Sequence, residues 1–265
     1  MIRSPAPRSQ RIEFLGLAFD SVTVNGAVDR FEEWIRGRFV GRIACVNVAL
    51  LMWTRSSPAL QEIYRRCDLL VADGMGIYYG SRLLGQPTPG ITNAVLLMDE
   101  LLKRAATNGY RLYLLGTTGE ILERALVRLR ERHPELLVVG HRDGFFSRAE
   151  EDEVVRGVVA ARPDILLIGI SSVRKDEFLD RQLSALGIPV CLGVGGAIDV
   201  LAGVYRIAPH AVRRAGLEWL YRLAQEPQRL WRRYLTTNAA FGVLLGQAFL
   251  RRLLPGLREL EGTRD

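Results

Sequence analysis

The chain has 265 residues, of which 48% are hydrophobic and 25% are charged. This is the composition of a globular protein, so it argues against disorder outside the chain ends. The formal net charge of +7 favours an anionic partner: a nucleic acid, a phosphorylated ligand or an acidic lipid surface. The length fits one large α/β domain plus an appendage.

The cysteine pattern and the hydropathy indicate where the protein works. Cys45, Cys67 and Cys191 are widely separated and form no Cys-x-x-Cys pair, which argues against a zinc site or a disulfide framework. No signal peptide is apparent at the N-terminus, and no apolar run reaches the roughly 20 residues of a bilayer span. We expect a cytoplasmic protein, at most attached to a membrane face.

An α/β body is expected over residues 11–204, after a flexible tail at residues 1–10. Strands are expected at 11–19, 42–48, 68–76, 110–116, 135–140, 163–170 and 188–194. Helices are expected at 24–39, from Pro58 with Ser57 as its cap, and at 119–132, 148–162 and 174–186. The later strands are apolar without alternation, which is typical of strands buried on both faces. The alternation of strands and helices predicts a Rossmann-like parallel sheet covered by helices.

A basic helical appendage is expected over residues 205–265. From Tyr205 to Arg258 there are ten arginines, only two acidic residues (Glu218 and Glu226) and no strand pattern. Glu218, Arg222 and Glu226 are spaced for pairs four residues apart on a helix, which Pro227 should break or kink. The part of the appendage before Pro227 is expected to pack on the body through Leu217, Leu220 and Ala224.

Glycine-rich loops follow several strands, where ligands gather in open parallel sheets. Gly116 and Gly119 are spaced to hold a phosphate, although a simple tight turn explains them better. In the segment 193–203, Gly193, Gly195 and Gly196 let the backbone approach a ligand closely. Asp199 is either a ligand of a ribose or sugar, or a residue that is favourable in the first turn of a helix. These two roles for Asp199 stay open.

Asp73 stands at the tip of the strand within residues 68–76. By itself it is most simply a turn residue, but a carboxylate beside an anion-binding loop also suits a general base. The three histidines lack metal-ligand spacing, and no GxSxG or HExxH motif is present. A metal site, a hydrolytic triad and a bound cofactor are therefore not expected.

In combination, these segments resemble the WecG/TagA/CpsF glycosyltransferases (glycosyltransferase family 26). The resemblance covers about residues 11–234, and its most distinctive part is GLEWLYRLAQEPQRLWRRY at 216–234. The other segments that carry it are 45–51, 71–85, 110–116, His133 to Leu136, 143–146, 164–172 and 193–203.

The resemblance implies an inverting, metal-independent transferase of the glycosyltransferase-E type. Such enzymes move a sugar from a UDP donor, often an N-acetylmannosamine derivative, to a polyprenyl-diphosphate-linked sugar at the inner membrane face. The family's proposed catalytic base falls on Asp73. The expected substrate-binding residues are Asn47, Cys45, Gly74, Asn93, Arg174, Lys175, Gly195, Gly196, Asp199, Arg206, Arg213 and Arg214.

Several residues depart from the family pattern. Cys45 lacks the hydroxyl of the family's threonine, and Gly90, Asn93 and Val95 replace an arginine and a Gly-x-Asp element. Val173 and Ile207 replace a proline and an arginine. These departures leave the sugar open, and they support the alternative of a catalytically degraded protein that binds nucleotide sugar or lipid diphosphate at a membrane.

The second half of the appendage suits an anionic membrane surface. Its expected membrane-binding residues are Arg229, Trp231, Arg232, Arg233, Arg251 and Arg252. The apolar stretch 239–257 is too short to span a bilayer but fits a helix lying in the interface. A contact between copies in a homo-oligomer, or a docked core helix, is the other interpretation.

Two further function classes fit less well. The GxGxxG fingerprint of a dinucleotide oxidoreductase is incomplete, although Asp143 imitates its acidic ribose ligand. DNA binding would explain the charge but not the loops at the strand ends, and no nucleic-acid module is visible.

Overall fold

The computed structural model describes residues 10–209, 211–212 and 216–254. The strands are β1 (Arg11–Phe14), β2 (Leu17–Asp20), β3 (Ile43–Val46), β4 (Leu69–Ala72), β5 (Arg111–Gly116), β6 (Leu137–Arg142), β7 (Ile165–Gly169) and β8 (Val190–Gly193). The first helices are α1 (Val24–Gly37), α2 (Val48–Ser56), α3 (Pro58–Arg65), α4 (Met75–Leu83), α5 (Ala94–Asn108) and α6 (Gly119–Arg132). They are followed by η1 (Arg148–Glu150), α7 (Glu151–Ala160), α8 (Ser172–Leu186), α9 (Ala197–Leu201), α11 (Glu218–Gln225) and α12 (Pro227–Leu253).

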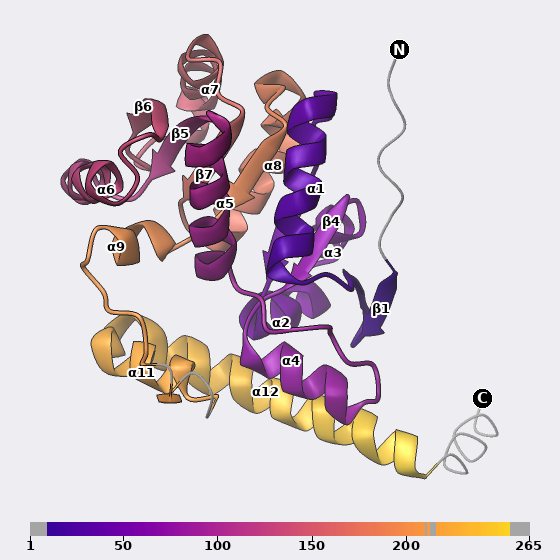
Figure 1. The fold of residues 1–265 in the computed structure, drawn as a ribbon. Coiled ribbons are helices and arrows are strands. Elements are labelled where there is room, and N and C mark those ends of the chain that lie inside the picture. Colours follow the sequence, from indigo (N-terminus) through magenta and orange to yellow (C-terminus); the bar gives the residue numbers. More distant parts are fainter. Residues whose placement is uncertain (1–9, 210, 213–215, 255–265) are drawn as a thin grey trace.

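The expected Rossmann-like parallel sheet is present. Four parallel strands lie in the order β6-β5-β7-β8, and β3 pairs with β4 in parallel beside them. A single parallel bridge between Gly41 and Val190 links the two sets at the β8 edge. The carboxyl ends of all these strands therefore face the same side of the molecule, where the candidate site lies (Figure 1).

Alternate residues of the strands enter separate cores on the two faces of the sheet. Cys45 and Val71 pack with α1, α5, α6 and α9 on one face. On the other face, β5, β7 and β8 pack with α7 and α8, while Ala44 and Leu70 pack with the β1–β2 hairpin, α2 and α3. Burial on both faces explains why these strands read as continuous apolar runs.

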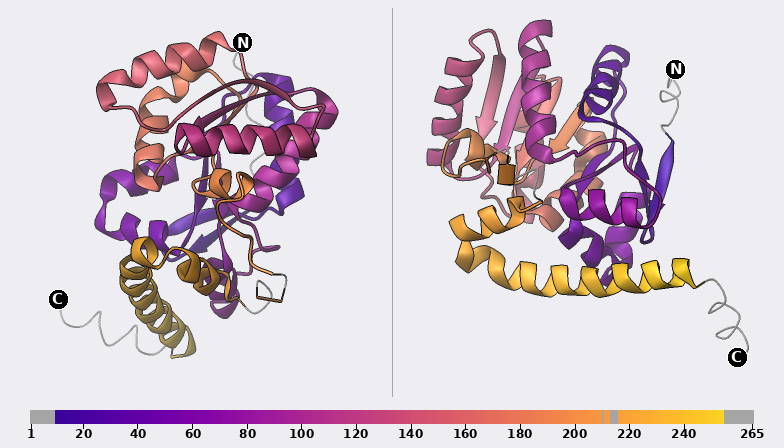
Figure 2. Two further views of the ribbon diagram at one scale, coloured as in Figure 1. Left: turned by 90° about the vertical axis from the view of Figure 1, so that its left-hand side faces the viewer. Right: turned by 60° about the horizontal axis from the view of Figure 1, so that its bottom comes forward.

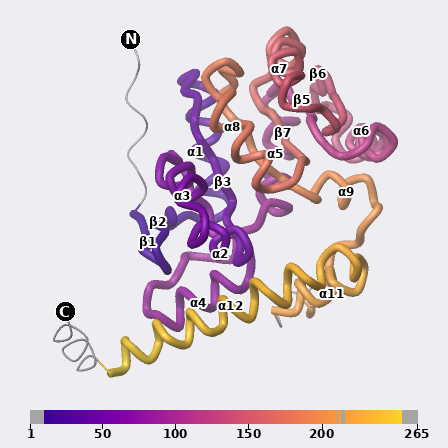
Figure 3. The backbone as a smooth tube through the Cα atoms, turned by 180° about the vertical axis from the view of Figure 1, so that it is seen from behind, coloured from indigo at the N-terminus to yellow at the C-terminus, as the bar shows by residue number. Residues whose placement is uncertain are grey.

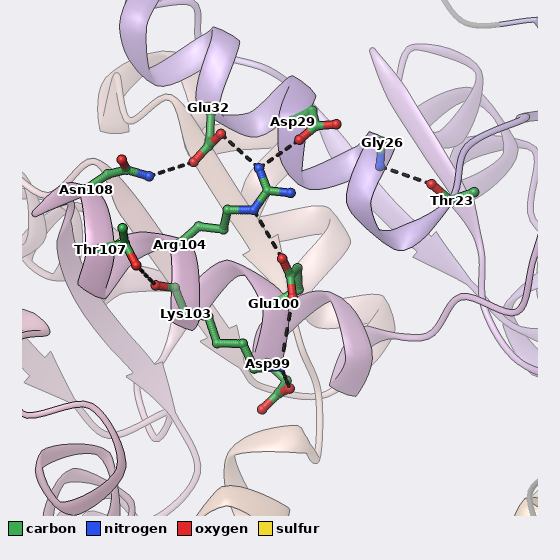
Figure 4. Close-up of polar contacts among 10 residues, drawn as sticks. All are labelled: Thr23, Gly26, Asp29, Glu32, Asp99, Glu100, Lys103, Arg104, Thr107 and Asn108. Carbon is green, nitrogen blue, oxygen red and sulfur yellow. Dashed lines mark hydrogen bonds and ion pairs between the residues drawn. The ribbon is translucent and has the colours of Figure 1, made fainter.

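Polar side chains define where several helices begin. The Ser57 hydroxyl accepts a hydrogen bond from Leu60 N at 3.3 Å, and Pro58 occupies the first turn of α3, as expected. Charged residues then tie α1 to α5: Arg104 contacts Asp29 at 2.8 Å and Glu32 at 3.1 Å (Figure 4). These two helices together cover the sheet beside the site.

Three parts of the body differ from the sequence-based expectation. Residues 11–19 form a hairpin, not one strand, because Leu15 and Gly16 take positive φ angles of 50° and 93° and reverse the chain. The strand β6 lies at the edge of the sheet, so it is only partly buried. Helices α2, α4 and α5 are not among the expected helices. The apolar residues of α2 and α4 merge with those of the preceding strands, whereas α5 follows a loop after α4.

The appendage is helical, and Pro227 separates its two helices as predicted. It occupies the first turn of α12, where it needs no N–H partner. The expected packing of α11 is wrong: Leu217 and Leu220 are 43% and 45% exposed, and Ala224 is exposed too. Neither expected pair forms; Glu226 contacts Arg229 at 2.5 Å instead.

The long helix α12 crosses the end of the molecule, below α11 at one end and α4 at the other (Figures 1 and 2). Phe241 anchors it by entering the same core as Phe14, with ring centroids 6.4 Å apart. A Cβ placed on Gly80 of α4 would lie 2.8 Å from the Phe14 ring and 3.2 Å from the Phe241 ring. A glycine at this position therefore lets α12 approach the body closely.

We expect Phe241→Ala to destabilise the protein by roughly 3 kcal/mol, because it removes a buried ring and leaves a cavity. Val243→Ala is the matched control: Val243 is 63% exposed on the same helix, and its change should stay within about 0.5 kcal/mol. Urea unfolding of both variants measures the difference. Equal losses in the two variants would contradict the docked position of α12.

Candidate active site

A cavity of about 1280 Å³ opens at the carboxyl ends of the strands, between the body and the appendage. The body contributes the ends of β3, β4 and β8 and the first turns of α2, α4, α5 and α8. The appendage closes it with α11 and α12. Predicted residues that line it are Asp73, Cys45, Asn47, Gly74, Asn93, Lys175, Gly195, Gly196, Arg229 and Arg233.

Asp73 directly follows β4 and is half-buried in this cavity. Its backbone N–H donates to Val46 O at 2.9 Å, and Gly74, with a positive φ of 89°, then turns the chain into α4. Burial raises the pKa of Asp73 to about 6, Arg222 lowers it, Glu218 raises it and a hydrogen bond from Asn47 lowers it. A carboxylate with this pKa is ionised at neutral pH yet basic enough to take a proton.

Two appendage side chains therefore act on Asp73 with opposite signs. Glu218 and Arg222 both line the cavity from α11. No carboxylate of the described residues lies within ion-pair distance of Arg222, so its charge is available to a ligand. The sequence interpretation missed this role because it assigned α11 to packing. The available signal was the distinctive GLEWLYRL segment itself, which places Glu218 and Arg222 four residues apart on one helix.

Lys175 is a buried cation at the floor of the cavity. Its Nζ lies 2.6 Å from Asp176 Oδ1, and the other oxygen of Asp176 accepts a 2.7 Å hydrogen bond from the Tyr64 hydroxyl. Burial alone lowers the pKa of Lys175, but Asp176 more than offsets this and raises it. Because a Cβ on Gly193 would lie 2.1 Å from the Lys175 side chain, only glycine leaves room for it.

The loop after β8 joins the cavity to the end of β5. Gly195 has a φ of +51°, which favours glycine. A Cβ on Gly196 would lie 3.1 Å from the Arg222 guanidinium and 3.5 Å from Asp199 Oδ2. The other oxygen of Asp199 accepts a 2.6 Å hydrogen bond from Thr117. Asp199 thus stands beside the cavity with one oxygen held and the other directed to the Gly196 loop.

Some predicted residues lie elsewhere. Arg174 points away from the cavity, donating to Gly144 O and Phe146 O and stacking on the Phe146 ring at 4.7 Å. Arg206 is exposed, and its backbone is bonded to the Gln225 side chain. Arg213 and Arg214 lie outside the described residues.

The predicted membrane residues divide between two sides of α12. Arg229 and Arg233 line the cavity, whereas Trp231 and Arg232 are exposed and absent from its lining. Arg251 and Arg252 line a smaller hollow at the far end of the helix, where Arg252 donates to Leu83 O at 3.1 Å.

Some of the residues that depart from the family pattern line the cavity, and others do not. Cys45, Val95 and Val173 line the cavity, while Gly90 and Ile207 do not. Burial, and then the charge of Asp73, raise the pKa of the Cys45 thiol, so it stays neutral. Asn47 and Asn93 line the cavity as predicted, but each also caps a helix, accepting from Leu50 N at 3.1 Å and Leu96 N at 2.8 Å.

The sequence profile of the "Glycosyl transferase WecG/TagA/CpsF family" matches residues 12–254. The chain belongs to this family. It is similar to proteins of Staphylococcus aureus strains MW2 and NCTC 8325, with 28% identity over 224 residues. The matches cover 84% of this chain and 87% of each relative, and both relatives are named N-acetylglucosaminyldiphosphoundecaprenol N-acetyl-beta-D-mannosaminyltransferase.

The family profile matches as far as residue 254, whereas the resemblance read from the sequence ends at Tyr234. The match therefore includes all of α11 and α12. The protein is a glycosyltransferase, as its sequence predicted. Among the helices the structure describes, none is both long and apolar enough to cross a bilayer. In the same residues, no group of three or more His, Cys, Asp or Glu side chains is placed to hold a metal ion.

The two α11 residues should shift the pKa of Asp73 in opposite directions. Arg222→Met removes a nearby positive charge and should raise this pKa above about 6, whereas Glu218→Gln removes a negative charge and should lower it. Carbon-detected NMR titration of the side-chain carboxyls measures both shifts, and Asp73→Asn assigns the signal. Shifts of the same sign in both variants would contradict the placement of α11 over Asp73.

Proposed function

We propose that this glycosyltransferase moves a sugar, with inversion, from a UDP-sugar to a polyprenyl-diphosphate-linked acceptor in bacterial cell-surface polysaccharide synthesis. The donor sugar is of the N-acetylmannosamine type or a related hexose, in line with the names of the relatives. The observation that carries the proposal is the position of Asp73, a carboxylate with a pKa of about 6 between two cationic groups in one large cavity.

The donor binds along the loop after β8. Its diphosphate contacts the backbone of Gly195 and Gly196 and the Arg222 guanidinium. Its ribose donates a hydrogen bond to Asp199 Oδ2, the oxygen that faces Gly196. Phe145 supports this placement, because its ring is 74% exposed and its backbone is linked to Asp199 through Thr117. Gly144, the residue before Phe145, donates to Thr117 O at 2.9 Å, and the Thr117 hydroxyl donates to Asp199. The uracil base stacks on this ring.

The transfer needs a base and a stabilised leaving group. Asp73 takes the proton from the acceptor hydroxyl as that oxygen attacks the anomeric carbon, and the bond from this carbon to UDP breaks. The diphosphate gains negative charge as it leaves. Arg222, Lys175 and backbone N–H groups are preorganised to meet that charge, so we expect no metal bridge.

We expect Asp73→Asn to lower turnover by roughly 10²–10⁴-fold, because it preserves size but removes proton affinity. UDP binding should persist, since the donor contacts lie on other residues. Released UDP is measured with UDP-sugars and a polyprenyl-diphosphate-sugar analogue, and UDP binding by calorimetry.

Asp199→Asn is the comparison variant, and it should raise the KM for the donor more than it lowers kcat. Undiminished turnover in Asp73→Asn would remove Asp73 as the base. UDP binding by a wild-type protein that transfers no sugar from any tested donor would favour the catalytically degraded alternative.

The outer face of α12 supports attachment to an anionic membrane, where such an acceptor resides. The residues Trp231, Leu235, Val243, Leu250 and Leu253 are exposed large apolar side chains on this helix. Arg232 and Arg251 are exposed beside them. An apolar stripe flanked by arginines fits the boundary between acyl chains and headgroups, on the inner face of the cell membrane.

We expect the double variant Trp231→Ser, Leu235→Ser to lose most of its binding to anionic vesicles in flotation at low salt. Val127→Ser is the control, because Val127 is a similarly exposed apolar residue on α6. Point variants are preferable to removing α12, which would take Phe241 from the core. If the wild-type protein ignores the vesicles, α12 is an oligomer contact or core element instead.

A further inference from the structure

The lining of the cavity changes from cationic to apolar along α12. The helix residues that line it are Arg229, Arg233, Tyr234, Asn238, Phe241 and Leu245, in this order from a cationic to an apolar end. Figure 3 shows the start of α12 beside α11 and its later part beside α4. The two ends belong to one continuous cavity, so a single ligand can contact both.

Helices α4 and α2 form the wall opposite the apolar end. Leu83 and Gly80 come from α4, and Val48 and Trp53 come from α2. A Cβ on Gly80 would lie 3.4 Å from Leu245, so the glycine sets how closely the two helices approach. Beside this contact, the apolar end of the cavity, here called the channel, runs along α2, α4 and α12.

The cationic end contains a charge in need of a partner. Arg233 Nε is buried without a hydrogen-bond partner, and no carboxylate among the described residues forms an ion pair with this guanidinium. Its neighbour in the chain, Tyr234, stacks against it at 5.2 Å. A diphosphate would satisfy both the donor and the charge.

We propose that the channel lined by α2, α4 and α12 binds the first isoprene units of the acceptor's lipid, with its diphosphate at Arg233. This assignment rests on the proposed function, because it takes the acceptor to be a polyprenyl diphosphate. The lipid thus leaves the site along α12 within the protein before it reaches the bilayer.

The dimensions agree with this assignment. At about 1.5 Å per helical residue, the twelve-residue step from Arg233 to Leu245 spans roughly 18 Å, enough for a diphosphate and several carbon–carbon bonds. The cavity volume of about 1280 Å³ exceeds the roughly 300–1,000 Å³ of a pocket for one small ligand. It can hold a donor sugar nucleotide and the head of a lipid together.

A series of diphosphates without any sugar tests the channel. The probes are inorganic, dimethylallyl, geranyl and farnesyl diphosphate, each below its micelle concentration and without vesicles or detergent, with binding measured by calorimetry. We expect each buried isoprene unit to tighten binding by roughly tenfold, as for an apolar side chain of similar size. Equal affinities for inorganic and farnesyl diphosphate would overturn the proposal.

Paired variants on α12 locate the binding face. Leu245→Asn should abolish most of the gain from geranyl to farnesyl diphosphate, whereas Leu250→Asn, on the exposed face, should leave it unchanged. Arg233→Met should weaken all four probes, inorganic diphosphate included. Leu83→Asn, at a position 44% exposed, replaces Leu245→Asn if that variant fails to fold. Equal losses in the inner and outer variants would refute the channel, and a loss in Leu250→Asn alone would place the lipid on the outer face.

These outcomes are separate from those of the proposed transfer. A chain-length series obtained with a protein that transfers no sugar would leave the channel standing and the transferase proposal refuted. Transfer without any chain-length dependence would refute only the channel.

Discussion

The docking of α12 on the body, in which Phe241 packs against Phe14 and Gly80, completes the candidate active site. Through this contact α12 is held to the body, and α11 is held to α12 by the edge-on packing of Trp219 against Tyr234 at 6.1 Å. Arg222 and Glu218 reach the cavity from α11. The docking of α12 thus sets the position of the charges around Asp73.

The protonation of Asp73 is shared between the body and the appendage. Burial within the body raises its pKa, and Asn47 of the body and Arg222 of α11 restrain that rise. The Lys175 ammonium contributes less, because Asp176 lies 2.6 Å from it and offsets its charge. Removing the appendage would therefore alter both the access to Asp73 and its proton affinity.

The sequence predicted the body better than the appendage, for a physical reason. Runs such as 163–170 are apolar throughout because both faces of the strand are buried, and that pattern is local. The docking of α12 depends instead on single contacts between distant residues, so periodicity alone gave Leu217 and Leu220 an inward role that the structure contradicts.

The candidate site, too, contains residues that the sequence could reveal and residues that it could not. Asp73 and the Gly195–Gly196 loop stand at strand ends, where any open parallel sheet places its ligands, so sequence reasoning could find them. Arg174 and Lys175 are adjacent in the sequence, yet one points to the Phe146 ring and the other into the cavity. Only the packing of α8 distinguishes them, and no local pattern encodes it.

The appendage arginines that line the cavity match the charge of the proposed substrates. Two diphosphates beside Asp73 would raise its pKa, because nearby negative charge disfavours a second anion. A base that begins with a pKa of about 6 would then be protonated at neutral pH and unable to act. Arg222, whose charge already contributes to that pKa, and Arg233 would counter the added negative charge by pairing with the diphosphates, since each places a positive charge on the cavity without a carboxylate partner among the described residues. In the proposed reaction, these cations therefore serve the base as well as the leaving group.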